Sequence, residues 1–287
     1  METVLESATR TAVIGPGRPL VVIGERINPT GRKALTEELK AGRMEVVRQD
    51  ALAQVAAGAR VLDVNAGVPG VDEAALLVAL AGVVAEVTDV PLCFDSSEDG
   101  ALEAALAAYD GKALVNSVTG EEARLERILP LVKRHGAAVV ALVTDETGIP
   151  ATPADRLAVA RRIVERAADH GIPPEDVVVD PVVMTVGADS SAAAVTLETI
   201  RLVRDELGTN LVCGASNVSF GLPDRHQVNS AFIAMAIHAG LAAVIANPLV
   251  AEIRKTILAA DLLLGRDAYA ATWIAAYRAE QAAAVGA

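Results

Sequence analysis

A short apolar run that ends in polar residues and is followed by a helical pattern recurs eight times along this chain of 287 residues. The runs are Leu20–Gly24, Arg60–Val64, Val90–Phe94, Ala113–Val115, Ala138–Val143, Asp176–Val179, Leu211–Ala215 and Ala242–Ala246. Strands that alternate with helices form a parallel sheet, and eight such units in about 250 residues match the size of a closed barrel. We therefore predict an α/β protein with a (β/α)8 TIM barrel; an open doubly wound sheet is the alternative.

Helical patterns fill the intervals between the runs. We expect helices over Thr36–Gly58, Asp72–Val87, Ser97–Tyr109, Glu121–His135, Thr152–His170, Ala192–Leu207, Gln227–Ala239 and from about Ala251 onwards. The apolar mass is Ala, Val, Leu and Ile, with only 2% aromatic residues, which suits a buried parallel sheet covered by helices. No linker divides the chain, so we predict one domain over residues 21–287, with residues 1–20 as an N-terminal extension that covers the barrel bottom.

Charge and cysteine usage limit the partners and the compartment. The net charge of −12 argues against nucleic acid and against an anionic membrane surface as partners. No apolar stretch is long enough for a membrane span, and the first 20 residues lack the layout of a signal peptide. The two cysteines, Cys93 and Cys213, lie far apart in apolar runs, so we expect reduced buried thiols and a cytoplasmic protein.

Working residues of such barrels lie at the carboxyl ends of the strands. At these positions the chain carries Glu25, Arg26, Asn28, Asp63, Asn65, Asp95, Ser96, Asn116, Ser117, Thr144, Asp145, Asp180, Ser216, Asn217 and Asn247. The set is rich in Asp and Asn and contains no Lys, Cys or His, which argues against a Schiff-base enzyme and against a zinc hydrolase. We therefore expect no metal site.

Carboxylates and amides around a ring suit a ligand such as a 2-amino-4-oxo-pyrimidine. A carboxylate accepts two parallel hydrogen bonds from a ring N–H and its exocyclic amino group, and an amide both donates and accepts. Asp95, Asn116 and Asp180 form such a trio on three strands. The alternative for any one of them is a cap on the following helix, and Asp63 and Asn65 could instead be structural polar groups inside the barrel.

Several motifs in a fixed order resemble those of the pterin-binding methyltransferases, which include the folate domain of cobalamin-dependent methionine synthase and the methyltetrahydrofolate:corrinoid/iron-sulfur protein methyltransferases. The motifs are VVIGERINPTGRK (Val21–Lys33), LDVNAG (Leu62–Gly67), LCFDSS (Leu92–Ser97), LVNSVTGEE (Leu114–Glu122), TGIP (Thr147–Pro150), VVDPVV (Val178–Val183), GASNVS (Gly214–Ser219) and the region Arg225–Pro248. Together they cover roughly residues 20 to 260.

The resemblance implies a (β/α)8 barrel, a homodimer, and roles for individual residues. Asp95, Asn116 and Asp180 would hold the pyrimidine ring of the pterin, and Asn217 would be the catalytic residue beside N5. The remaining pterin-binding candidates are Asp63, Asn65, Ser219, Glu25, Asn28 and Arg225. Phe220 departs from the polar residue that often follows Asn-Val-Ser in the family, so its effect on N5 stays open.

The implied activity is methyl transfer between N5 of tetrahydrofolate and the cobalt of a corrinoid. The chain has no Asp-x-His-x-x-Gly pattern, so cobalamin would arrive on a separate corrinoid protein. The alternatives are a dihydropteroate synthase-like condensing enzyme, with Arg26, Arg32 and Arg225 as pyrophosphate ligands, and a non-catalytic pterin-binding subunit. The direction of transfer, the methyl donor and the corrinoid partner stay open.

Overall fold

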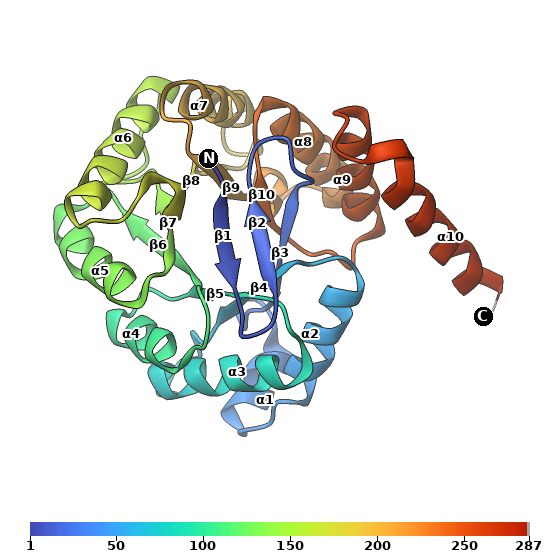
Figure 1. The fold of residues 1–287 in the computed structure, drawn as a ribbon, viewed down its shortest axis with the longest axis horizontal. Helices are drawn as coiled ribbons and strands as arrows, with labels where there is room; N and C mark the ends of the chain where they lie inside the picture. The colour runs from blue at the N-terminus through green and yellow to red at the C-terminus, as the bar shows by residue number, and fades with distance from the viewer. Residues whose placement is uncertain (286–287) are drawn as a thin grey trace.

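The computed structural model describes residues 1–285 and confirms the closed parallel barrel (Figure 1). Its strands follow the order β10-β3-β4-β5-β6-β7-β8-β9 around the ring. They are β3 (Val21–Ile27), β4 (Val61–Asn65), β5 (Leu92–Asp95), β6 (Leu114–Thr119), β7 (Ala138–Leu142), β8 (Val177–Asp180), β9 (Asn210–Gly214) and β10 (Ala243–Ala246). All eight predicted runs are strands, and β3 and β6 extend further toward the carboxyl end than expected.

Helices surround the barrel on its outer face. They are α1 (Lys33–Lys40), α2 (Glu45–Ala56), α3 (Glu73–Val87), α4 (Asp99–Ala108), α5 (Glu122–His135), α6 (Pro153–Asp169), α7 (Ala192–Glu206), α8 (Arg225–Ala239), α9 (Ala251–Leu263) and α10 (Ala271–Val285), with short 3-10 turns η1 (Pro174–Asp176), η2 (Ala215–Ser219) and η3 (Ala268–Ala270). In Figure 1, α10 leaves the ring and points away from the barrel.

Three helix predictions need correction. The single helix expected over Thr36–Gly58 is two helices, because Gly42 adopts a left-handed φ of 68° and ends α1. The helix expected from Ser97 begins at Asp99, and the side chain of its N-cap residue, Glu98, makes no capping hydrogen bond. The helix expected from Gln227 begins at Arg225. By contrast, Thr152 caps α6, since its hydroxyl accepts the Asp155 N–H.

An antiparallel hairpin of β1 (Thr3–Glu6) and β2 (Thr11–Ile14) lies across one end of the barrel (Figure 1). Its buried residues Leu5, Ala12 and Ile14 pack with the inward-facing side chains at the amino ends of the strands. These are Val21, Ile23, Val61, Cys93, Leu114, Ala138, Val140, Val178, Val212 and Ala243. The amide of Asn210 fastens the hairpin to β9, donating to Thr3 Oγ1 at 2.9 Å and to the Ile14 carbonyl at 3.0 Å.

The cysteines are free and buried, as predicted. Within the described part of the chain, no helix combines the length and the apolar character needed to cross a membrane.

Candidate functional site

Polar side chains line the carboxyl end of the barrel interior because strand side chains alternate between two faces. On β4, Val61 belongs to the inner apolar cluster, so Asp63 and Asn65 point inward as well. The register places Asn65 beside Asp95 and Asp95 beside Asn116 on successive strands. Asp180 ends β8 beside Leu142 of β7. The trio predicted from three separate strands therefore shares one end of the barrel.

Two of the polar residues hold members of the trio in place. Asn65 donates from Nδ2 to Asp95 Oδ2 at 3.0 Å, and its Oδ1 accepts the Gly67 N–H at 2.8 Å. Asp63, only 2% exposed, accepts from Asn116 Nδ2 at 3.4 Å. Asp63 and Asn65 are thus engaged mainly with protein groups, and they orient Asp95 and Asn116.

None of the strand-end residues caps a helix. Asp180 Oδ1 accepts the N–H of Val182 at 2.8 Å, two residues ahead, and Asn65 and Asn28 make the same local bond with Gly67 and Thr30. These are Asx turns. Each uses one side-chain oxygen at the start of a βα loop.

Burial makes this end of the barrel unfavourable for negative charge. It raises the pKa of Asp63 to about 8, with the neighbouring charge of Asp95 as the next cause, and it raises the pKa of Asp180 to about 7. The pKa values of Asp95 and Glu25 are raised by burial as well. Such a set of carboxyl groups gains most from a ligand that donates hydrogen bonds.

The turn η2 lies over the mouth between β9 and α8. The Asn217 side chain is exposed and has no hydrogen-bond partner among the described residues. Its Nδ2 lies 3.4 Å from the point where a Cβ on Gly214 would be, so the glycine leaves room for the amide above β9. Asn217 is therefore free to bond a ligand.

Ser219 and Arg225 are bound to protein groups instead. The Ser219 side chain is fully buried, and its hydroxyl donates to Asn229 Oδ1 at 2.6 Å. Arg225 donates to Ser219 Oγ at 3.1 Å and to the Ser216 carbonyl at 2.7 Å. It also lies 5.8 Å from the ring centre of Phe220, which is 69% exposed. These residues brace η2 beneath Asn217.

The polar residues at the carboxyl end of β3 and in the loop that follows it have different surroundings. Glu25 accepts from Ser216 Oγ at 3.3 Å, so it lies beside η2. Arg32 forms an ion pair with Asp50 at 2.6 Å and is occupied there. Arg26 places its Nε in a buried position without a hydrogen-bond partner.

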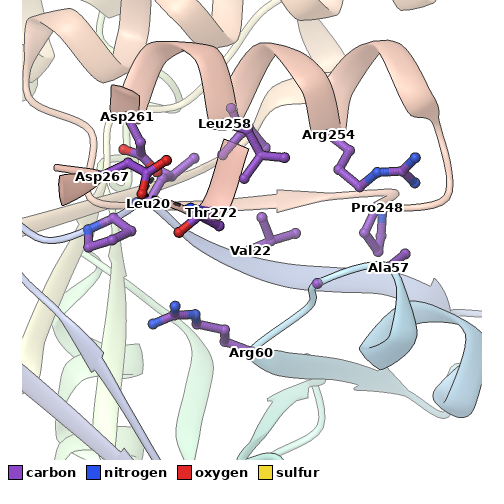
Figure 2. Close-up of a pocket in the computed structure, with 13 residues that line it drawn as sticks. Leu20, Val22, Ala57, Arg60, Pro248, Arg254, Leu258, Asp261, Asp267 and Thr272 are labelled. Carbon is purple, nitrogen blue, oxygen red and sulfur yellow. Dashed lines mark hydrogen bonds between the residues drawn. The ribbon is translucent and has the colours of Figure 1, made fainter. Parts of the chain in front are cut away.

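A separate hollow of about 210 Å³ lies on the outer wall of the barrel, between α2 and α9 (Figure 2). Leu20, Val22 and Leu258 give it an apolar lining. Its two acids are engaged, since Asp261 accepts the Leu20 N–H and Asp267 accepts the first N–H groups of α10. The hollow contains none of the strand-end residues, so the candidate site remains the barrel mouth.

Sequence reasoning missed several buried polar residues near this mouth, among them Asn229 on α8, Thr196 on α7 and Arg156 on α6, which is 3% exposed. A signal was present, since Arg156 continues the apolar stripe of Ala160, Ile163 and Ala167 at helical spacing. An arginine in that stripe must be buried and hydrogen-bonded.

A model of the family described as pterin binding enzymes matches residues 24–247. The chain belongs to this family. It is 31% identical over 267 residues to the methylcorrinoid:tetrahydrofolate methyltransferase of Eubacterium limosum, covering 90% of this chain and 96% of that protein. It is also 33% identical over 249 residues to the methionine synthase of Mycobacterium leprae, of which it spans about a fifth (21%).

Solved structures agree with the fold. The dihydropteroate synthase of Yersinia pestis superposes with a TM-score of 0.67 at 17% identity, covering 91% of this chain and 98% of that one. The enzyme from Thermus thermophilus gives 0.66 at 22% identity, covering 91% and 99%. At such identities the likeness concerns the barrel alone.

Proposed function

We propose that the chain transfers a methyl group between N5 of tetrahydrofolate and the cobalt of a corrinoid on a separate protein. The observation that carries this proposal is the unengaged amide of Asn217 above a ring of Asp and Asn side chains. The named function of the Eubacterium limosum relative, which matches almost its whole length, supports the same reaction.

The pyrimidine part of the pterin would lie among Asp95, Asn116 and Asp180. Asp95 and Asp180 each have one oxygen held by a protein N–H, from Asn65 and Val182, which leaves the other oxygen for the ring. Bonds from ring N–H groups stabilise the ionised form of a carboxyl group whose pKa burial has raised. Binding energy and ring orientation would come from this set.

The chemical step needs a hydrogen bond at N5. From methyltetrahydrofolate, the N5–CH3 bond breaks, its electron pair stays on nitrogen, and the Co(I) electron pair forms the new bond to carbon. The amine leaves more easily as N5 gains a proton or a strong hydrogen bond. Asn217 can give a bond that strengthens in the transition state. In reverse, the N5 lone pair attacks the methyl carbon, the Co–C bond electrons return to cobalt, and N5 releases its proton to solvent.

A corrinoid carried by a partner has to reach the open mouth. Exposed large apolar residues occur on four successive loops, Ile149 after β7, Met184 after β8, Phe220 after β9 and Leu249 after β10. Within the described residues, the loops after β3 to β6 carry none. We therefore expect the partner to approach over the half of the mouth that holds Asn217. The homodimer and the cytoplasmic location stay predictions.

The dihydropteroate synthase alternative has weaker support. Its pyrophosphate would need free cationic groups, and of the three candidates only Arg26 is free among the described residues, since Arg32 is paired with Asp50 and Arg225 is bonded to η2. The assay described next distinguishes the enzyme from a non-catalytic pterin-binding subunit.

The test follows methyl transfer in both directions. Purified protein is mixed with methylcobalamin and tetrahydrofolate, and then with Co(I) cobalamin and methyltetrahydrofolate, while the Co(I) absorption band is recorded. Protein-dependent turnover in either direction supports the proposal. Tetrahydrofolate binding by calorimetry without turnover, even with a cognate corrinoid protein, supports the binding subunit. Failure to bind tetrahydrofolate overturns the proposal.

A further inference from the structure

Arg156 on α6 is a buried cation with no ion-pair partner among residues 1–285. Its guanidinium donates only to neutral oxygens. Nε bonds the Pro150 carbonyl at 2.9 Å, and Nη1 bonds the carbonyls of Pro181 and Val182, both at 2.8 Å. One side chain therefore joins the loops that follow β7 and β8. Burying an arginine is costly, so this position calls for a reason beyond packing.

The carbonyl of Val182 belongs to a strained residue. Val182 has a φ of 61°, which is rare for any residue with a side chain and most unfavourable for a β-branched one. Two donors hold that carbonyl, Arg156 Nη1 and the buried hydroxyl of Thr196 on α7 at 3.0 Å. The N–H of Val182 meanwhile donates to Asp180 Oδ1. The strained turn is what aims this N–H at the carboxylate.

We propose that Arg156 is a positioning residue for Asp180, fixing the Pro181–Val182 turn so that one carboxylate oxygen is held by the Val182 N–H and the other is presented to the ligand. The inference rests on the proposed function only for the identity of that ligand. Arg156 itself is too deeply buried to touch it.

The positive charge of Arg156 also acts on Asp180, by favouring its ionised form. Arg156 from α6 and the thiol of Cys213 from β9 are the titratable groups that face Asp180. Strand β7 has no titratable side chain, and the charged residues of α7 are all exposed at the surface: Glu198, Arg201, Arg204, Asp205 and Glu206. Arg156 thus lowers the pKa of Asp180 against the burial that raises it. Its removal should favour the protonated acid.

The first test replaces Arg156 and needs no ligand. In Arg156→Gln, the 13C carboxyl resonance of Asp180, assigned by its loss in Asp180→Asn, should titrate at higher pH than in the wild type. Arg161→Gln is the matched control, since Arg161 lies on the same helix but pairs with Glu206 at the surface. An unchanged titration in folded Arg156→Gln, or an equal shift in the control, overturns the inference. Neither result depends on whether tetrahydrofolate is the ligand.

The second test separates charge from geometry. Arg156→Lys keeps the charge, but its single nitrogen cannot occupy both positions, Nε and Nη1, from which the guanidinium donates to the two loops. We expect its Asp180 titration to stay near that of the wild type while tetrahydrofolate binds roughly tenfold more weakly. This milder variant also decides the matter if Arg156→Gln does not fold. If Arg156→Lys binds tetrahydrofolate as tightly as the wild type, the positioning role is excluded. If the wild type does not bind tetrahydrofolate, the proposed function is refuted, but the titration test of Arg156 remains valid.

Discussion

The interior of the barrel differs between its two ends, although the same eight strands line both. At the amino ends, Val21, Val61 and Val178 pack against Leu5 and Ile14 of the hairpin. Two or four residues further along the same strands stand Asp63, Asn65 and Asp180. The apolar end gains free energy from burial, while the polar end buries carboxyl groups with raised pKa values. Stability and binding are thus separated along one axis, and substitutions at the two ends should affect different measurements.

The largest effect on stability is expected at the apolar end. Leu5→Ala removes a fully buried side chain from the hairpin cluster and should lower the free energy of unfolding by about 2–5 kcal/mol. Urea unfolding measures this loss. Leu52→Ala, at a position of α2 that is 51% exposed, is the matched control and should change stability by less than about 0.5 kcal/mol. The folded Leu5→Ala protein should bind tetrahydrofolate as the wild type does; weaker binding would mean that the two ends are coupled.

The largest effect on catalysis is expected at the polar end. Asn217→Ala removes an exposed amide that has no described protein partner. It should lower kcat by about 10²–10³-fold, the usual cost of removing a preorganised donor to a developing charge. Tetrahydrofolate binding and stability should change little, because Asp95, Asn116 and Asp180 remain. Stopped-flow rates and calorimetry compare the two quantities, and equal losses in both would remove the assigned role at N5.

Asn210→Ala makes the same change as Asn217→Ala, asparagine to alanine, at the opposite end of the barrel. The Asn210 amide is buried, and its loss leaves the Ile14 carbonyl and Thr3 without that donor. We expect the free energy of unfolding to fall by about 1–3 kcal/mol. The rate of transfer per folded molecule should stay at the wild-type value, and a fall in that rate would argue against separate functions for the two ends.

The fold was predictable from the sequence because its signal is local and repeated. Each strand is a short apolar run with a turn signal at its end, and the eight-fold rhythm selects a closed barrel. The helix break at Gly42 was missed although glycine is a common helix terminator. Gly42 adopts the left-handed φ of 68° that ends α1.

The residue types of the site were predictable from the sequence, but the contacts that hold these residues were not. Their positions at strand ends imply that Asp95, Asn116 and Asp180 share one end of the barrel, and the strand register agrees, with Asp95 directly beside Asn116. The sequence predicts that Ser219 binds the pterin, yet its side chain is fully buried against Asn229, whereas Asn217 is exposed. Arg156 reaches β8 from a separate helix. Such links depend on tertiary packing, which spacing along one segment does not encode.

The remaining comparison is the most specific to the polar end, and it depends on pH. Asp63 has an ordinary pKa of 3.8 when unfolded and one raised to about 8 by burial. Between these values the native state keeps a proton that the unfolded state has released, so the contribution of Asp63 to wild-type stability falls as pH rises from about 4 to about 8. Asp63→Asn can still accept from Asn116 and has no proton to lose. Its stability relative to the wild type should therefore increase across that range and level off above it.

Asp176→Asn is the counterpart at the apolar end. Asp176 is also buried, but its Oδ1 lies 2.5 Å from Lys112 Nζ. The substitution leaves that ammonium group unpaired, so it should lower stability, opposite in sign to Asp63→Asn. Thermal unfolding of both variants and the wild type at several pH values between 4 and 9 makes the comparison. If both variants shift stability in the same direction, the presence of a cationic partner does not decide whether a buried carboxyl group stabilises this fold.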